Sequence, residues 1–315
     1  MTDRIKGIHH ITAVAGDAQR NLDFYSKTLG LRLVKKTVNF DDPGTYHLYY
    51  GNEQGEPGTI LTFFPWKHVK QGMTGTGMAT EIGYSVPAGS LEFWKERLSN
   101  AGISSSDINK SFGEDYISFR DPDGLTLKLI VPQTPDTRTP WVNGGISEEN
   151  ALKGFHSIVL TLNDGKQTAA ILTDVFGYKL VNKEGNTSRY TTDAIEGASV
   201  VDIIEIPDGR PGTVAGGTNH HVAFRVKDEK TLMEYRAKIS SLGFNITPKI
   251  DRNYFYSLYF REPGGVLFEI ATDNPGFAVD EKLEELGSNL KLPEQYEGRR
   301  TDIERVLPKL ELVNN

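Results

Sequence analysis

The chain has 315 residues, of which 37% are hydrophobic and 24% charged, and its net charge is −7. This composition is typical of a globular protein with enough core for about two domains of roughly 150 residues each. The acidic balance, without any block of Lys or Arg, excludes a nucleic-acid-binding surface. Because there are no cysteines, disulfides, zinc–thiolate sites and thiol nucleophiles are excluded, and any metal must be held by His and carboxylate groups.

The hydropathy pattern indicates no membrane segment. No apolar run approaches about 18 residues, and the N-terminal MTDRIKG lacks the apolar core of a signal peptide. We therefore expect a cytoplasmic protein that does not bind membranes.

One order of elements recurs four times along the chain. Residues 5–66 predict a strand (GIHHITAV), a helix (AQRNLDFYSKTLG) that stops at Gly30, and three further strands. Residues 76–132, 152–207 and 217–272 repeat this order, each with a strand, a helix and about three strands. The sequence therefore predicts an α+β fold of four βαβββ modules.

The stretch between the second and third modules is rich in Pro, Thr, Gly and Asn. We interpret residues 139–151 as a linker between two tandem domains, an N-terminal one (1–138) and a C-terminal one (152–273). Residues 274–315 differ from the modules and predict a C-terminal helical tail of two short helices, packed on the outside of the protein or on a partner.

Two His-His pairs, His9-His10 and His220-His221, occupy matched first strands, where alternation allows only one histidine of each pair to face inward. Aligning the first strands gives one column of positions: His10, Thr80, Ser157 and His221. Aligning the last strands six residues beyond Pro57, Pro122 and Pro263 gives a second column: Phe63, Lys128 and Glu269, with Glu205 placed more loosely.

Two histidines and one carboxylate survive in these columns. His10, His221 and Glu269 predict a 2-His-1-carboxylate metal site, which leaves three open positions on an Fe(II) ion for substrate and O₂. Modules one and four must then pair, which leaves modules two and three to pair with each other. In that second pair we expect Lys128 and Glu205 to form an ion pair.

The βαβββ repeat, with histidines on first strands and a carboxylate on the last, resembles the vicinal-oxygen-chelate superfamily of glyoxalase I, bleomycin-resistance proteins and extradiol dioxygenases, over about 270 residues. The stretches GIHHITAV, RLVKKTVNFDDPGTYHLYYGN, NHHVAFRV and DRNYFYSLYFREPGGVLFEI are most similar to the hydroquinone ring-cleaving dioxygenases. That resemblance implies a non-haem Fe(II)-dependent ring-cleaving dioxygenase, with Mn(II) as the alternative ion. It would act on hydroquinone-type aromatic diols with O₂, in quinone detoxification or aromatic degradation.

The same resemblance implies catalytic roles for His9, Thr12, His220, Arg252 and Tyr259. Tyr259 and Arg252 would orient a phenolate and stabilise negative charge that develops on it. Either His9 or His220 would exchange protons near neutral pH. His47 and His68 have no partner in this scheme and are expected to be structural or exposed.

The sequence leaves other functions open. A glyoxalase-like isomerase would need a second carboxylate where Phe63 stands. A catechol extradiol dioxygenase would place its first ligand in module three, where Ser157 stands and His156 faces the opposite way. A metal-free quinone- or drug-binding protein would keep the fold without an ion. Assembly into a homo-oligomer is compatible with each of these.

Overall fold

The structure, a computed structural model, describes residues 4–312 and contains four copies of one βαβββ unit. Unit one comprises β1 (Ile8–Ala15), a helix formed by α1 (Ala18–Leu22) and η1 (Asp23–Thr28), β2 (Arg32–Val38), β3 (Tyr46–Gly51) and β4 (Ile60–Pro65). Unit two comprises β5 (Met78–Ser85), α2 (Leu91–Asn100), β6 (Asn109–Ser111), β7 (Glu114–Arg120) and β8 (Thr126–Val131). Unit three comprises β9 (Gly154–Leu162), a helix formed by α3 (Lys166–Ala170) and η2 (Ile171–Val175), β10 (Lys179–Glu184), β11 (Thr187–Thr191) and β12 (Val200–Glu205). Unit four comprises β13 (Thr218–Val226), α4 (Glu229–Ser241), β14 (Ile250–Asp251), β15 (Phe255–Arg261) and β16 (Leu267–Pro275), so the predicted repeat is confirmed.

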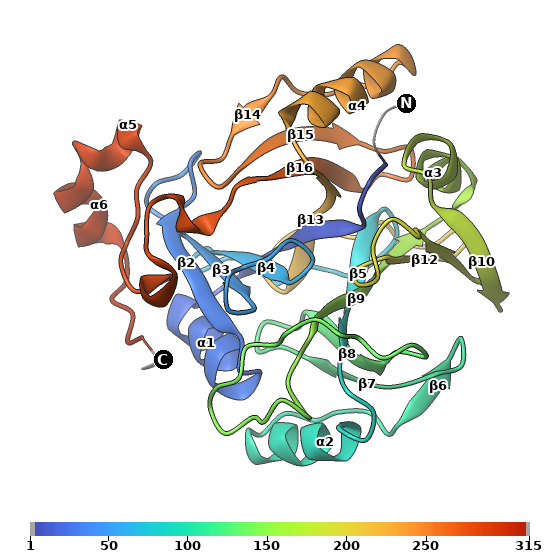
Figure 1. The fold of residues 1–315 in the computed structure, drawn as a ribbon, viewed down its shortest axis with the longest axis horizontal. Helices are drawn as coiled ribbons and strands as arrows, with labels where there is room; N and C mark the ends of the chain where they lie inside the picture. Colours follow the sequence, from blue (N-terminus) through green and yellow to red (C-terminus); the bar gives the residue numbers. More distant parts are fainter. Residues whose placement is uncertain (1–3, 313–315) are drawn as a thin grey trace.

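The four units form two eight-stranded sheets. One sheet has the order β14-β15-β16-β13-β1-β4-β3-β2 and the other β10-β11-β12-β9-β5-β8-β7-β6 (Figure 1). The central antiparallel pairs, β1 with β13 and β5 with β9, join one unit to another. Units one and four therefore share a sheet, as do units two and three, and the pairing expected from the ligand positions is confirmed.

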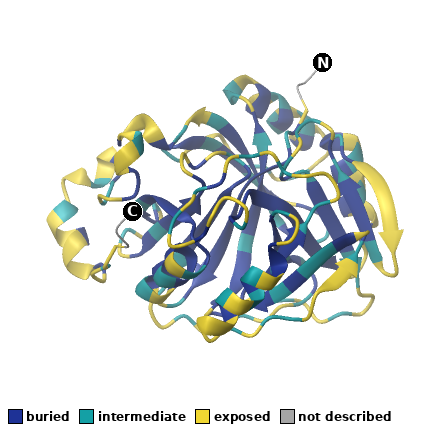
Figure 2. Cartoon of the chain, turned by 60° about the horizontal axis from the view of Figure 1, so that its bottom comes forward, coloured by how far each residue is buried: buried dark blue, intermediate teal, exposed yellow. Residues whose placement is uncertain are grey.

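The helices lie on the outer side of the sheets, where their apolar faces are buried and their polar faces exposed (Figure 2). Hydrogen bonds from these helices connect unit one with unit two and unit three with unit four. Tyr25 Oη, on the helix of unit one, donates to Asp121 in unit two at 3.0 Å. Thr168 Oγ1, on the helix of unit three, donates to Glu262 in unit four at 2.5 Å.

A glycine with positive φ introduces the first strand of every unit: Gly7, Gly77, Gly154 and Gly217. The clearest requirement is at Gly217, whose φ is +77°, because an added Cβ would lie 1.9 Å from the carbonyl oxygen of Asp123. These glycines set where each first strand begins and therefore which side chains face inward.

The predicted helical tail is confirmed. It contains short 3₁₀ turns (Phe277–Val279 and Leu283–Glu285), α5 (Glu294–Glu297) and α6 (Arg300–Val306) and lies beside β2 (Figure 1). Lys291 N donates to Lys36 O at 3.0 Å, so the tail follows the edge strand of the first sheet. The last three residues of the predicted tail, 313–315, fall outside the described residues, as do residues 1–3 of the predicted N-terminal domain. No helix within residues 4–312 has the length and apolar character needed to cross a membrane.

Candidate metal centre

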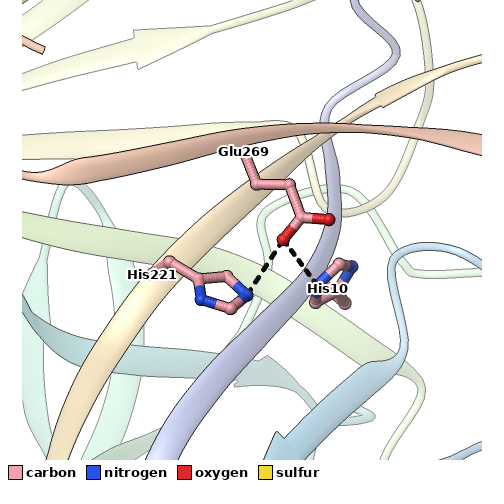
Figure 3. A group of neighbouring side chains, drawn as sticks. All are labelled: His10, His221 and Glu269. Atoms are coloured by element: carbon pink, nitrogen blue, oxygen red, sulfur yellow. Dashed lines mark ion pairs between the residues drawn. The ribbon is translucent and has the colours of Figure 1, made fainter. Parts of the chain in front are cut away.

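Three neighbouring strands of the first sheet bring His10, His221 and Glu269 together. In the strand register, His10 on β1 lies opposite Ala223 on β13, and Ala223 lies beside Glu269 on β16. His221 precedes Ala223 by two residues and so faces the same way. The three side chains converge on one point (Figure 3).

The atoms that could bind a metal lie within 4.8 Å of one another. Glu269 Oε2 is 3.2 Å from His10 Nε2 and 2.9 Å from His221 Nε2, and all three side chains are buried (Figure 3). Nevertheless, His221 Nε2 and Glu269 Oε2 have no hydrogen-bond partner of suitable geometry within the described chain. Buried polar atoms are normally satisfied, so two such atoms aimed at one point fit a divalent cation between them.

The electrostatics of Glu269 favour its charged form. Burial raises the pKa of this carboxyl group, but the proximity of His10 and His221 outweighs burial and lowers the pKa well below the usual value. Ser257 Oγ also donates a hydrogen bond to Glu269 Oε1. The carboxylate is therefore ionised and oriented, with its second oxygen directed at the two imidazoles.

Each inward-facing histidine is held by the histidine that precedes it. His9 Nε2 donates to the Thr272 carbonyl at 3.0 Å, which leaves His9 Nδ1 to accept from His10 Nδ1 at 2.9 Å. The proton of His10 therefore sits on Nδ1, and Nε2 presents a lone pair to the common point. His220 and His221 repeat the contact between Nδ1 atoms, which lie 2.8 Å apart.

Both backing histidines are neutral near pH 7. Burial, reinforced by the neighbouring His10, lowers the pKa of His9 well below 6.5, and burial with the neighbouring His221 lowers that of His220 to about 4. His9 uses both ring nitrogens in hydrogen bonds behind His10, whereas His220 lines the adjoining cavity. The two histidines proposed for proton exchange therefore occupy different environments.

A cavity of about 380 Å³ opens in front of the cluster. Its walls are mainly aromatic, and they are completed by a few polar side chains. The lining residues are His10, Asn39, Phe40, Asp41, His47, Tyr49, Phe64, Trp66, His220, His221, Arg252, Phe255, Tyr259 and Leu267. A volume of this size and composition suits a small aromatic molecule.

Arg252 and Tyr259 lie together in the cavity wall. Arg252 Nε donates to Tyr259 Oη at 3.3 Å, and the guanidinium group lies 5.4 Å from the centre of the Tyr259 ring. Burial raises the pKa of Tyr259 well above 10, so its hydroxyl keeps its proton. Tyr259 is also directly beside Glu269 in the strand register. Of the residues that the resemblance added, Arg252, Tyr259 and His220 line the cavity, while His9 and Thr12 lie behind it.

The position related to Glu269 by the repeat is Thr62, and the placement of Phe63 there was wrong. Thr12 pairs with Thr62 in the same way that Ala223 pairs with Glu269. Phe63 faces the core and packs on the Tyr25 ring at 4.6 Å. The turn after Pro57 is one residue shorter than the turn after Pro263, so counting from the prolines shifted the alignment by one. Unit one therefore contributes a hydroxyl group, and no carboxylate, opposite Glu269.

His47 is the residue that the sequence interpretation missed, because no matched column contained it. It lines the cavity, and its Nε2 lies 2.8 Å from Thr62 Oγ1. The available signal was the alternation in YHLYYG, which puts His47 and Tyr49 on one face of a strand. His68, in contrast, is exposed, as expected.

The expected Lys128–Glu205 ion pair is wrong in one partner. Lys128 Nζ pairs with Glu81 at 2.5 Å, whereas Glu205 accepts from Gly165 N at 3.0 Å and lies 3.9 Å from Lys183. The register shows that Glu81, and not Thr80, occupies the first-strand position of unit two, because β5 has an irregularity between Ala79 and Glu81. An ion pair does fill this cleft, but both partners come from unit two.

The unit-three position in the second cleft is Asp202, which lies beside Val159 in the register. Asp202 is held by Arg189 at 2.8 Å, and Arg189 in turn contacts Glu114 at 2.5 Å. His156 joins this network through Glu114 at 3.0 Å and lies in the sheet that does not contain the candidate metal centre. The second cleft is therefore occupied by neutralised charges.

Comparison with known proteins agrees with this architecture. A family model described as the Glyoxalase/Bleomycin resistance protein/Dioxygenase superfamily matches residues 7–129 and 154–270. A Bacillus subtilis protein named "Putative ring-cleaving dioxygenase MhqO" is 46% identical over 312 residues, which cover 99% of each chain. The chlorohydroquinone/hydroquinone 1,2-dioxygenase of Sphingobium indicum is 38% identical over 313 residues, covering 98% of this chain and 97% of that protein.

Solved structures show the same fold. A Bacillus subtilis structure with 45% identity covers 99% of this chain and is itself fully covered, with a TM-score of 0.95. Glyoxalase I from Zea mays is 16% identical, and the match covers 85% of this chain and 92% of that protein, with a TM-score of 0.63. With a family model that matches most of its length and full-length relatives well above 30% identity, the chain belongs to the glyoxalase/bleomycin resistance protein/dioxygenase superfamily.

Proposed function

We propose that the protein is a ring-cleaving dioxygenase that uses a divalent metal, Fe(II), held by His10, His221 and Glu269, and that it acts on hydroquinone-type aromatic diols. The observation that carries this proposal is the buried cluster of two imidazoles and one carboxylate, whose free atoms point at one place. Full-length relatives with ring-cleaving names support the reaction class, and one of them is named for hydroquinones. A role in quinone detoxification or aromatic degradation follows from that substrate class.

When bound, the Fe(II) ion supplies a centre at which a deprotonated hydroxyl group and O₂ can be brought together. The protein supplies the remaining requirements. Arg252 offers a cation to a phenolate oxygen, and Tyr259 offers a protonated hydroxyl group beside Glu269. Phe64 and Trp66, whose rings lie 5.3 Å apart in the cavity wall, flank an aromatic ring and exclude water.

Residue type also decides against an isomerase of the glyoxalase kind. Such a site would use a second carboxylate from unit one, and that position holds Thr62. Three protein ligands leave open positions that a co-substrate can occupy, whereas four leave fewer. Of the two histidines considered for proton exchange, His220 lines the cavity, whereas His9 is engaged behind His10.

The test is anaerobic reconstitution with Fe(II), or with Mn(II), followed by oxygen-uptake assays with hydroquinone, methylhydroquinone and catechol. We expect uptake of one O₂ per ring with the hydroquinones, and ring opening seen by mass spectrometry. His10→Ala should lose both bound metal and oxygen uptake.

His156→Ala is the matched control, because His156 is also buried and paired with a glutamate but lies in the other sheet. We expect it to keep the metal and the activity. Full oxygen uptake by the His10 variant would refute the ligand assignment, and loss of uptake only in the His156 variant would move the site to the second sheet.

A further inference from the structure

The loop after β2, residues 39–45, contributes to the wall of the cavity beside the candidate metal centre. Thr37 lies opposite His47 in the register, and Asn39 follows Thr37 by two residues, so Asn39 faces the cavity that His47 also lines. The Asn39 side chain is only 8% exposed. It is therefore an almost enclosed polar group at the border of a mainly aromatic cavity.

A contact with the backbone fixes the orientation of the Asn39 carboxamide. Asp41 N donates to Asn39 Oδ1 at 3.0 Å. A backbone N–H group can only donate, so the side-chain oxygen faces Asp41 and the amide nitrogen occupies the other end of the group. Within residues 4–312 this nitrogen has no hydrogen-bond partner, so its N–H groups are free to bind a ligand.

Asn52, which follows β3, uses its oxygen in the same way but has no free donor. Its Oδ1 accepts from Glu56 N at 3.0 Å, and its Nδ2 donates to Glu56 Oε2 at 2.6 Å. Asn52 is 5% exposed and is not among the residues that line the cavity. A free amide nitrogen is therefore not a requirement of an asparagine that orders a turn, and at Asn39 it coincides with the cavity.

The loop is held in place without a ligand. Asn39 O accepts from Asp42 N at 3.2 Å, and Trp66 Nε1 donates to the Asp42 carboxylate at 3.0 Å. Tyr296 Oη, in the tail, donates to Phe40 O at 2.7 Å. A donor that is fixed in advance loses little freedom when a ligand binds.

Asn39 and the candidate metal ligands occupy different parts of the cavity wall. In the sheet order, β2 is three strands from β1, which contains His10, or roughly 14 Å along the curved sheet at about 4.8 Å per strand. The two edges of this sheet meet at the cavity, because Arg252 Nη1, next to β14, lies 3.8 Å from Asp41 Oδ2 in the loop after β2. A ring bound in the cavity therefore has the metal centre on one side and Asn39 on another.

We propose that Asn39 is a specificity-determining residue whose amide group donates a hydrogen bond to the oxygen atom of a para-diol that lies away from the metal centre. This inference rests on the proposed function and names what distinguishes its substrate class. A hydroquinone has its oxygen atoms at opposite ends of the ring, so one can reach the ion while the other reaches Asn39. The adjacent oxygen atoms of catechol cannot reach both.

The test compares three ligands that differ only at the para position. Phenol has no oxygen there, 4-methoxyphenol has an oxygen that can only accept a hydrogen bond, and hydroquinone has a hydroxyl group that can accept or donate. Their dissociation constants are measured at pH 8 under argon with protein loaded with Zn(II), by quenching of tryptophan fluorescence, since Trp66 lines the cavity. Metal content is measured for every variant.

The parent should bind hydroquinone about tenfold more tightly than phenol. Asn39→Asp keeps the size of the side chain and the acceptor for Asp41 N, but a carboxylate cannot donate. We expect this variant to lower the affinity for 4-methoxyphenol, relative to phenol, by about tenfold. The affinity for hydroquinone relative to phenol should change by less than about threefold, because its hydroxyl group can donate to the carboxylate.

Asn39→Ser is a second, uncharged variant, which keeps an oxygen for the turn but is too short to reach the ligand. It should reduce the preference for hydroquinone over phenol to less than about threefold, with unchanged affinity for catechol and unchanged metal content. Asn52→Asp is the matched control, because Asn52 is equally enclosed but lies away from the cavity. It should leave all the affinity ratios unchanged.

Three results would overturn the inference: equal losses for all three ligands in Asn39→Asp, an undiminished preference for hydroquinone in Asn39→Ser, or the same change of ratios in the control. The proposed function fails separately. If the parent shows the preference but the Fe(II)-loaded protein consumes no O₂ with any diol, the proposed function is wrong and the assignment of Asn39 stands. If the Fe(II)-loaded parent consumes O₂ but the Zn(II)-loaded parent binds phenol and hydroquinone equally, only the assignment of Asn39 is wrong.

Discussion

Glu269 occupies an unusual position for an ionised side chain. It is fully buried, and its Oε2 atom lacks a hydrogen-bond partner within residues 4–312 although two imidazole nitrogens lie within 3.2 Å. The two histidines lower the pKa of this carboxyl group, so it is ionised, and its free oxygen atom is available to a cation.

Replacing Glu269 with Gln tests this point. The amide keeps the size and the bond from Ser257 but removes the charge. We expect the variant to bind the cation less well, because metal binding uses the deprotonated carboxylate and a neutral amide cannot replace it. Excess metal should raise the melting temperature of the parent only, because a ligand stabilises the state that binds it.

Glu262→Gln is the control for this variant. Glu262 is equally buried, but it serves the turn before β16, where it accepts from Gly264 N and Val266 N. It should keep the metal-dependent rise in melting temperature. If Glu269→Gln also kept that rise, Glu269 would not be a ligand.

At the scale of elements, the strand register determines what each cleft contains. Equivalent positions hold His10, His221, Glu269 and Thr62 in one sheet and Ser157, Glu81, Lys128 and Asp202 in the other. In the second sheet the ammonium group of Lys128 neutralises the carboxylate of Glu81, whereas the first sheet has the proposed metal site. The carboxylates in the two clefts are therefore neutralised in different ways.

Lys128→Met should destabilise the protein by about 1–3 kcal/mol, because it leaves Glu81 partly buried without its partner. Glu81→Gln in the same chain should restore most of this loss. Urea unfolding at pH 7 measures both, and metal binding should not change in either variant. A loss of metal in the Lys128 variant would show that the clefts depend on each other.

The turn between β7 and β8 contains a carboxyl group whose titration affects stability. Burial raises the pKa of Asp121 to about 6, above its ordinary value of 3.8, although Leu125 N and Tyr25 Oη donate to it. The unfolded chain therefore loses this proton at a lower pH than the folded chain. Asp121 thus makes the protein less stable as the pH rises from about 4 to 6, and the loss is complete above pH 6.

Asp121→Asn removes this titration. The free energy of unfolding of the variant minus that of the parent should increase by about 1–3 kcal/mol between pH 4 and pH 7. This difference should change with pH only below pH 6. Urea unfolding of both proteins at several pH values gives the difference directly. A difference independent of pH would mean that Asp121 is ionised in the folded protein throughout.

The sequence was sufficient to predict those features that the repeat marks. His10, His221 and Glu269 stand in matched columns, and the pairing of the units followed from them. Positions that an irregular strand or a shortened turn shifts by one residue were not predictable. A strand irregularity before Glu81 and a shortened turn before Thr62 each shift the register, and both depend on how strands pair in space. The same holds for His47, whose significance comes only from its neighbours across the sheet.

At the scale of the whole molecule, the tail is attached to the first sheet by a buried charge. Lys35 Nζ, with no exposed surface, lies 2.6 Å from Asp280 Oδ1 and 2.5 Å from Glu281 Oε2. The rings of Phe277 and Tyr49 lie 5.2 Å apart, so the tail also supports β3, the strand that contains His47. The division into domains 1–138 and 152–273 stays a prediction, which limited proteolysis within 139–151 would test.

Lys35→Met should cost about 3–5 kcal/mol and release the tail, because Glu281 would be buried without its partner. Urea unfolding measures the loss of stability, and the rate of chymotrypsin cleavage within the tail, beyond residue 276, measures its release. The exposed Lys179–Asp193 pair, 3.0 Å apart, provides the control, and Lys179→Met should cost less than about 1 kcal/mol. Unchanged cleavage in the Lys35 variant would show that apolar contacts alone hold the tail.

The sheet that contains the candidate metal centre is made from the first and the last units of the chain, while the other sheet is contiguous in sequence. During synthesis on the ribosome, the second sheet, β5 to β12, can therefore form while β16, the strand that contains Glu269, has not yet been made. Until then His10 and His221 lack the third member of the proposed metal site. That site is thus completed only after translation has passed β16, when the other strands of both sheets have already been made.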